Sequence, residues 1–291
     1  MPRSEHTYWA DMQSNRLGSP ELPIADGQLH RFHVEGDRSG SKNGWYVLYG
    51  DGLPAGSYGS WKTGETINWG ARLDRQQTAQ ERKAIAKLRR QAGKRRQDEQ
   101  QMVWQAAATK AQTLWGASPP ATDSHPYLQE KCVRAHGLRL QRSALVVPLR
   151  EVSGEIQSLQ FIHPDGSKRF LSNGKVVGGC FLIGDVNKVI YVVEGFATGA
   201  TVHECTGEAV FVAFNCGNLK AVAVAIRLKY RNIKLVVAGD NDQFTRSNPG
   251  RAAAILAARA VGGSYIVPDF AGVDLSDKPT DFNDLARLEN S

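Results

Sequence analysis

The sequence predicts α+β N-terminal parts followed by an α/β domain in which helices flank a parallel sheet. Two apolar runs rich in Val and Ile, 188–194 and 233–239, stop abruptly at glycine and carboxylate residues. Such runs are typical of buried strands in a parallel sheet. Shorter alternating runs separated by Gly and Asp turns occupy 28–69 and 144–171, and this pattern is typical of antiparallel sheets. The strand types therefore change along the chain.

Composition is that of a soluble globular protein. The chain has 291 residues, 41% of them hydrophobic and 22% charged, which is enough for about two domains. It contains no run of 18 apolar residues, and the N-terminus lacks the pattern of a signal peptide. We therefore expect a soluble protein in the cytoplasm of a bacterial host, with no membrane partner. The net charge of +7 favours a polyanionic partner.

Cysteine spacing argues against structural metal and disulfides. The four cysteines are far apart in sequence and form no C-x-x-C pair: Cys132, Cys180, Cys205 and Cys216. We expect reduced thiols, neither a zinc site nor disulfides.

The first predicted part, 1–72, is a small aromatic-rich β module that binds no zinc. We expect 1–27 to be a loosely packed arm and 28–69 to form an antiparallel sheet of three or four strands. Aromatic and basic residues alternate here, which suits stacking on unpaired bases. We expect about two thirds of these aromatics to be core residues instead. The candidate DNA contacts are Arg31, Trp45, Trp61 and Lys62.

The second part, 73–118, is predicted as a basic helical linker of one long helix or two in series. Nine Lys or Arg residues fall between Arg75 and Arg96, against a single acid. Such charge is usually a solvated helix face, but contact with nucleic acid is an equal alternative. The candidate DNA contacts are Arg89, Arg90, Lys94 and Arg95. The Pro-containing stretch 116–123 is expected to be a linker.

The third part, 119–187, is predicted to be a mixed subdomain with strands at 144–150, 156–163 and 168–171, and a strand 181–184 that leads into the parallel sheet. The fourth part, 188–291, alternates strands and helices. Its remaining expected strands are 210–214 and 265–267, and its expected helices are 197–205, 218–230 and 249–260.

Carboxylates end the two long strands of the fourth part. In a parallel sheet the functional crevice lies beyond the carboxyl ends of the strands. Glu194, Asp240 and Asp242 would emerge there and repel one another by several kcal/mol at an effective dielectric constant of ~20. Hard oxygen ligands favour Mg²⁺ or Mn²⁺. The alternative is that all three are ordinary turn residues at strand ends.

Three motifs carry a family resemblance. Residues 192–199, 213–218 and 238–242 resemble the motifs of the TOPRIM fold, which DnaG-like primases, type IA and II topoisomerases and some nucleases share. The stretch 168–184 is similar to the region just before TOPRIM in DnaG-like primases. The order of these parts resembles a TOPRIM-domain DNA primase of phage, plasmid or mobile-element type that lacks the N-terminal zinc ribbon.

The resemblance implies roles for individual residues. Glu194, Asp240 and Asp242 would be catalytic and would bind Mg²⁺ or Mn²⁺. Asp281 and Asp284 look like ligands of a further metal ion, although Asp281 is equally suited to cap a short helix. Contacts to nucleotide or template are expected from Lys168, Arg169, Gly195, Arg246 and Arg251. For Asn218 we expect a simple N-cap.

The implied activity is that of a DNA-directed RNA polymerase of primase type. It would join ribonucleoside triphosphates into short primers on single-stranded DNA. The alternatives are a TOPRIM metal-dependent nuclease and a non-catalytic protein that binds single-stranded DNA during replication; a type IA topoisomerase is disfavoured. No Walker A sequence occurs. We therefore expect a replicative helicase on a separate chain or in a further C-terminal region.

Overall fold

A computed structural model describes residues 4–19, 21–37, 40–50, 54–60, 63–70, 79–245 and 247–289. Within the long helix α2, the side chains of 79–89, 91–93, 95–96 and 99 also lie outside the description. The chain divides into two compact units, 1–98 and 99–291, and the boundary falls inside α2 (Ala79–Ala117).

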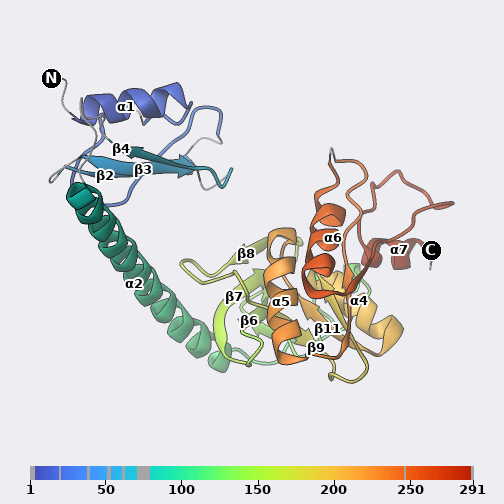
Figure 1. The fold of residues 1–291 in the computed structure, drawn as a ribbon. Coiled ribbons are helices and arrows are strands. Elements are labelled where there is room, and N and C mark those ends of the chain that lie inside the picture. The colour runs from blue at the N-terminus through green and yellow to red at the C-terminus, as the bar shows by residue number, and fades with distance from the viewer. Residues whose placement is uncertain are drawn as a thin grey trace. The chain divides into compact units, whose positions relative to one another are not determined.

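The first unit contains the predicted antiparallel sheet. Its four strands are β1 (His30–Phe32), β2 (Gly44–Tyr49), β3 (Ala55–Ser60) and β4 (Thr66–Gly70), in the order β1-β2-β3-β4 (Figure 1). Every neighbouring pair is antiparallel. The sheet expected between residues 28 and 69 is therefore confirmed.

The expectation of a loosely packed N-terminal arm is wrong. Helix α1 (Ser4–Ser14) places Tyr8 and Met12, one turn apart, in the core of the sheet, where both are fully buried. The Tyr8 hydroxyl donates to the carbonyl oxygen of Ser57 at 2.7 Å. A Cβ atom on Gly56 would approach the Tyr8 ring to 2.8 Å. The polar composition of 1–27 conceals a helix that docks on the sheet through two buried residues, Tyr8 and Met12.

Most described aromatic residues of this sheet are core residues, as expected. Tyr58 is fully buried, and Trp45 is only 8% exposed. A Cβ atom on Gly59 would meet the Trp45 ring at 2.9 Å, so the indole lies directly over the backbone of β3. Trp45 therefore offers little ring surface to a nucleic-acid base, and its proposed stacking role is corrected.

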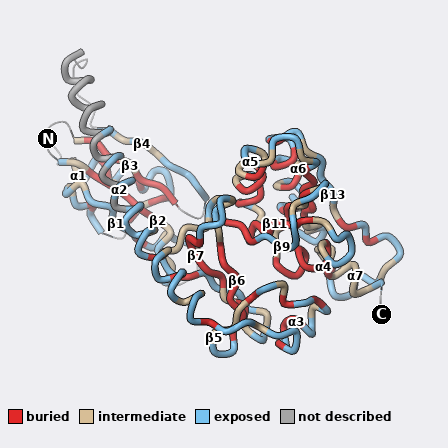
Figure 2. The backbone as a smooth tube through the Cα atoms, turned by 90° about the horizontal axis from the view of Figure 1, so that it is seen from below, coloured by how far each residue is buried: buried red, intermediate tan, exposed pale blue. Residues whose placement is uncertain are grey.

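The second unit begins with the C-terminal half of α2, a single helix as far as Ala117. Ala111, Leu114 and Trp115 pack on a four-stranded antiparallel sheet in the order β5-β6-β7-β8. Its strands are β5 (Arg139–Gln141), β6 (Ala144–Arg150), β7 (Ile156–Ile162) and β8 (Lys168–Phe170). Figure 2 shows the buried positions along β6 and β7.

The stretch 116–123 does not form a loose linker. The backbone N–H of Ala121 donates to the carbonyl oxygen of Leu138 at 2.9 Å, and Ser118 is buried. The guanidinium of Arg139 donates to the carbonyl oxygen of Trp115, which satisfies an acceptor at the end of α2. The short helix α3 (Pro126–Glu130) follows.

The remainder of the unit is the predicted α/β sheet, in the order β13-β12-β10-β11-β9. Its strands are β9 (Phe181–Ile183), β10 (Val189–Val193), β11 (Ala209–Val212), β12 (Lys234–Ala238) and β13 (Ser264–Ile266). The pairs among β10 to β13 are parallel, whereas β9 runs antiparallel to β11 at the edge. The sheet is thus mostly parallel.

Helices cover both faces of this sheet (Figure 1). Helix α4 (Phe196–Thr206) packs on one face, and α5 (Leu219–Lys229) with α6 (Pro249–Val261) packs on the other. Along β10, Val193 faces the α4 side while Ile190 and Val192 face the α5 side. Burial on both faces explains why the strand is a continuous apolar run. Helix α7 (Phe282–Glu289) lies against α4.

In the described residues, no helix combines the length and apolarity needed to cross a membrane. The four cysteines are free thiols, with Cys180 buried and Cys132 and Cys205 exposed.

Candidate functional site

Two carboxylates meet at the carboxyl edge of the parallel sheet. Val193 of β10 pairs with Ala238 of β12, so Glu194 and Asp240 follow their strands at the same edge. The positions of the strands explain this proximity, because β10 and β12 are direct neighbours although more than 40 residues separate them. The sheet thus brings together the acids that the sequence singled out.

Burial and mutual repulsion perturb both carboxyl groups. Burial, followed by the charges of Glu194, Asp281 and Asp242, raises the pKa of Asp240 to about 8. The pKa of Glu194 is also raised, mainly by burial and by Asp242, while a hydrogen bond from the Cys216 backbone and the charge of Lys168 oppose the rise. The site therefore holds more negative charge than the surrounding protein compensates.

Asp240 has one oxygen without a partner. Its Oδ1 atom is buried and accepts no hydrogen bond. A buried carboxylate oxygen in this state is costly unless a proton or cation satisfies it. The donor set is made of hard oxygens, which fits Mg²⁺ or Mn²⁺. Among the residues that the structure describes, however, no three acidic, His or Cys side chains are already arranged to hold a metal ion.

Asp242 also makes structural hydrogen bonds at the start of α6. Its Oδ2 atom accepts a hydrogen bond from the Gly250 backbone N–H at 2.8 Å, and its own N–H donates to Asn248 Oδ1 at 2.9 Å. These bonds fix the start of α6 beside the acids. A Cβ atom on Gly250 would lie 2.8 Å from the Asp240 carbonyl oxygen and 2.9 Å from Asp242 Oδ2. Gly250 was not among the predicted site residues, although it is the second residue of the helix expected over 249–260.

Asp281 and Asp284 form the cap of α7. Asp281 Oδ1 accepts from the Asp284 N–H at 2.9 Å, and Asp284 Oδ2 accepts from the Thr280 N–H at 3.1 Å. Asp281 Oδ2 also accepts from the Thr198 hydroxyl at 3.0 Å. The capping role weighed for Asp281 is thus present, while its charge still acts on Asp240 and Glu194. Asp284 instead pairs with Lys131, with 3.7 Å between Nζ and Oδ1.

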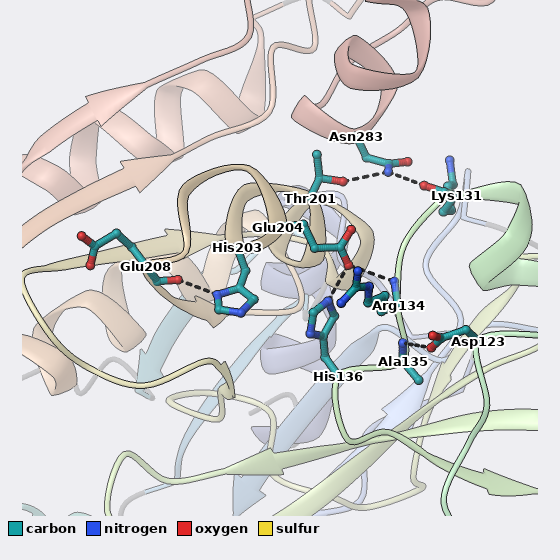
Figure 3. Close-up of polar contacts among 10 residues, drawn as sticks. All are labelled: Asp123, Lys131, Arg134, Ala135, His136, Thr201, His203, Glu204, Glu208 and Asn283. Atoms are coloured by element: carbon teal, nitrogen blue, oxygen red, sulfur yellow. Dashed lines mark hydrogen bonds and ion pairs between the residues drawn. The ribbon is translucent and has the colours of Figure 1, made fainter. Parts of the chain in front are cut away.

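A buried amide fixes α7 against the rest of the unit (Figure 3). Asn283 is 1% exposed, and its Nδ2 donates to the Lys131 carbonyl oxygen at 2.7 Å and to Thr201 Oγ1 at 2.9 Å. We call Lys131, Thr201 and Asn283 the α7 clasp. A separate contact along the same seam joins His136 Nε2 to Glu204 Oε1 at 2.5 Å. Asn283 was missed because its neighbours in the sequence are the more conspicuous acids.

Lys168 and Arg169 point to opposite faces of β8, because successive strand residues alternate. Lys168 lies 5.8 Å from the Tyr127 ring centre. Burial lowers the pKa of Lys168, and the charges of Asp281, Asp240 and Glu194 oppose this, although part of the side chain stays solvent-exposed. The charge of Lys168 thus acts on Glu194 and Asp240. Arg169 instead lines a hollow of about 410 Å³ with His163, Pro164, Asp165 and Ser167.

Gly195, which follows Glu194, has open space at the position where a side chain would begin. Gly195 precedes α4 with a φ of −105°, which any residue can adopt. A Cβ atom there would meet only Thr198 Oγ1 at 3.5 Å, an ordinary contact. Neither the backbone conformation nor the packing of the chain requires glycine here. Arg251 is exposed on the first turn of α6, and Arg246 lies outside the described residues.

The expectation that Asn218 is a simple N-cap is wrong, because its side chain makes no capping hydrogen bond to α5. Its side chain accepts from the Gly178 N–H at 2.8 Å and donates to the carbonyl oxygens of Gly179 and Ala213. Asn215 provides the capping contact instead, accepting from the Asn218 N–H at 3.0 Å. Asn218 thereby fixes the loop whose Cys216 N–H bonds to Glu194.

The candidate DNA contacts of the first unit and α2 are only partly described. Arg31 is exposed, with its Nε donating to the Lys42 carbonyl oxygen at 3.0 Å, and Arg90 and Lys94 are exposed on α2. Trp61 and Lys62, and the side chains of Arg89 and Arg95, lie outside the described residues.

Comparisons with known proteins find both a matching family and similar sequences. The family model described as the Toprim domain matches residues 189–291. A DNA primase TraC from Escherichia coli is 36% identical over 267 residues, covering 86% of this chain and 25% of that protein. A second DNA primase TraC from Escherichia coli is 34% identical over 274 residues, covering 89% of this chain and 18% of that protein. The chain thus spans a quarter or less of the length of these relatives.

The solved structures that the chain matches include two from primases. The primase fragment of the bacteriophage T7 primase-helicase protein has 17% identity and a TM-score of 0.40, covering 60% of this chain and 74% of that one. The DnaG catalytic core has 16% identity and a TM-score of 0.39, covering 65% of this chain and 79% of that one. The resemblance to TOPRIM-containing primases drawn from the motifs is confirmed by the family match and the TraC relatives. Residues 189–291, with their mostly parallel sheet and strand-end acids, belong to the Toprim domain family.

Proposed function

We propose that this chain is a DNA primase that synthesises short RNA primers on single-stranded DNA, in the replication of a phage, plasmid or mobile element. One arrangement carries the proposal: Asp240 has a buried unpaired oxygen, and the charges of Glu194, Asp281, Asp242 and Lys168 all act on its carboxyl group. The similarity to the TraC primases along most of the chain supports it.

Each residue then has a role in nucleotidyl transfer. The carboxylates of Asp240, Glu194 and Asp242 would hold the cation, with Asp281 beside them. A bound Mg²⁺ or Mn²⁺ supplies charge neutralisation and a lower pKa for the attacking 3′-hydroxyl. Glu194, whose own pKa is raised, is suited to accept a proton from that hydroxyl.

The phosphates would be contacted by basic residues and by the backbone at the start of α4. Lys168 would pair with the triphosphate of the incoming ribonucleotide, relieving the low pKa that burial imposes on its ammonium group. The open space above Gly195 at the start of α4 admits an anion close to the backbone. Arg246 and Arg251 are proposed to contact phosphates, and Arg169 to contact the template backbone.

We also propose a division of labour along the chain. The module 1–72 and the basic helix 73–118 would bind the template through Arg31, Trp61, Lys62, Arg89, Arg90, Lys94 and Arg95, while 119–187 and 188–291 form the synthesis core. A replicative helicase on another chain, or in another region of a longer one, would expose the single strand.

The test incubates the purified chain with single-stranded templates of varied sequence, labelled ribonucleoside triphosphates and Mg²⁺ or Mn²⁺. We expect short labelled products that disappear in Asp240→Asn and in Glu194→Gln. Shortening of an end-labelled template without new products would assign a nuclease. Salt-sensitive DNA binding with neither activity, also in the presence of a helicase, would assign a non-catalytic binding protein.

A further inference from the structure

An exposed aromatic ring lies on the same face of β8 as Lys168. Residues two apart on a strand share a face, so Phe170 accompanies Lys168 rather than Arg169. Phe170 is 37% exposed. Its ring meets Phe214 edge to face, with 6.2 Å between ring centres and 72° between planes. The proposed phosphate contact and an accessible ring therefore stand side by side on one strand.

Phe214 is held in an unusual backbone conformation. Its φ is +71°, in the left-handed region that bulky side chains rarely adopt. The side chain is only 8% exposed and belongs to the core shared by α4 and the two sheets. Phe214 also lies two residues before Cys216, whose N–H bonds to Glu194. Strained residues of this kind concentrate at functional sites.

We propose that Phe170, which contacts Phe214 edge to face, is a stacking platform for the base of the nucleoside triphosphate whose phosphates Lys168 contacts. This inference rests on the proposed function and adds a base-binding subsite to it. Residues two apart on a strand are separated by about 7 Å, comparable to the separation of base and phosphate within one nucleotide. The platform is sequence-tolerant, because every base has a π face.

The edge-to-face contact fits this role. The contact with Phe214 restricts the Phe170 ring, while 37% of the residue remains exposed. A fixed ring loses little conformational freedom when a base stacks on it. An isolated exposed Phe would need no explanation. Here, however, the ring contacts Phe214, whose backbone is strained, and shares its face of β8 with the cation Lys168.

The test measures binding of two probes in the presence of Mg²⁺: ATP, and inorganic triphosphate, which has no base. We expect Phe170→Leu to weaken ATP binding about 10-fold and to leave triphosphate binding unchanged. Lys168→Met should weaken both probes. Phe170→Tyr should retain ATP affinity, because the aromatic face is kept. Leu228→Ala, which alters a side chain that is 72% exposed on α5, serves as the control and should change neither probe.

The outcomes separate this inference from the proposed function. Equal ATP affinity in Phe170→Leu and the unaltered chain would overturn the platform, while the Lys168 effect and primer synthesis would leave the primase assignment standing. If Phe170→Leu instead weakened the binding of an oligodeoxynucleotide and not of ATP, the ring would stack on the template, and the assignment to the incoming nucleotide would be wrong. Failure of the unaltered chain to bind ATP with Mg²⁺ would overturn the platform, and lack of primer synthesis would separately overturn the proposed function.

Discussion

At the scale of single residues, the buried carboxyl group of Asp240 makes the stability of the folded protein depend on pH. Its pKa of about 8 lies above the value of about 3.9 expected in the unfolded chain. Between these values the folded protein keeps a proton that the unfolded chain releases. Stability must therefore fall as the pH rises from about 4 to 8, with a slope of up to about 1.4 kcal/mol per pH unit for one proton.

We predict that Asp240→Asn flattens this pH dependence and raises the unfolding midpoint of the metal-free protein at pH 8, because the neutral amide is not repelled by Glu194 and Asp281. Chemical unfolding in EDTA at pH 5 to 9 measures it. Gln243→Ala, altering an exposed residue of the same loop, is the control. An equal pH slope in Asp240→Asn and the unaltered chain would contradict the account of the raised pKa.

Gly195 gives a second prediction. Because its φ is ordinary and a Cβ atom would meet only Thr198 Oγ1 at 3.5 Å, Gly195→Ala should fold with a free energy of unfolding within about 1 kcal/mol of the unaltered chain. The added methyl group would enter the space assigned to nucleotide. We expect KM for ribonucleoside triphosphate to rise about 10-fold, measured by primer synthesis at varied nucleotide. An unchanged KM would show that no ligand approaches this backbone.

At the scale of elements, the α7 clasp positions an acid of the site. Asn283 fixes α7 to Lys131 and Thr201, and the same helix start carries Asp281, which faces Asp240. Asn283→Leu keeps the approximate volume but removes both hydrogen bonds, leaving the Lys131 carbonyl oxygen without this donor. We expect a loss of stability of about 1–3 kcal/mol and a rise of about 10-fold in the Mg²⁺ concentration that gives half-maximal primer synthesis.

The matched control lies on the same seam. Glu204→Gln weakens the contact to His136 without touching α7. It should lower stability modestly and leave the Mg²⁺ dependence as it is. If both variants shifted the Mg²⁺ dependence in proportion to their loss of stability, the clasp would act only on the fold and would have no positioning role.

Helix α1 contributes to the stability of the first unit. Tyr8 is fully buried and donates to the Ser57 carbonyl oxygen, so Tyr8→Ala should lower the stability of the first unit by about 3–5 kcal/mol. Tyr8→Phe, which loses the hydroxyl alone, should cost about 1 kcal/mol. Urea unfolding followed by fluorescence measures both. An undiminished midpoint in Tyr8→Ala would mean that α1 does not belong to this core.

At the scale of the whole molecule, the net charge of +7 predicts salt-dependent DNA binding. Arg90 and Lys94 are exposed one turn apart on α2. If each contacts a phosphate of single-stranded DNA, the double variant Arg90→Ala, Lys94→Ala should reduce the slope of log K against log salt by about 1.4. Anisotropy with a labelled oligonucleotide measures it. Arg259→Ala with Lys234→Ala, which removes two exposed charges of the second unit, is the control; equal slopes in both double variants would assign α2 no specific role.

The sequence by itself determined the strand types, the parallel arrangement of β10 to β13 and the strand-end positions of Glu194 and Asp240. These properties follow from local patterns, since burial on both faces of a strand requires a continuous apolar run. It also indicated the aromatic sheet of the first unit. Helix α1 was not predicted, because Tyr8 and Met12 are its only buried residues and two positions do not establish a helical pattern.

Only the tertiary structure decided which polar residues share a neighbourhood. Asn218, Asn283 and Gly250 act through contacts with residues distant in sequence or through the closeness of a neighbouring backbone, and no local pattern records such contacts. The same holds for Trp45, whose ring is covered by the backbone of β3. Periodicity reports which face of an element is buried, whereas the partner of a buried polar group depends on how the elements pack.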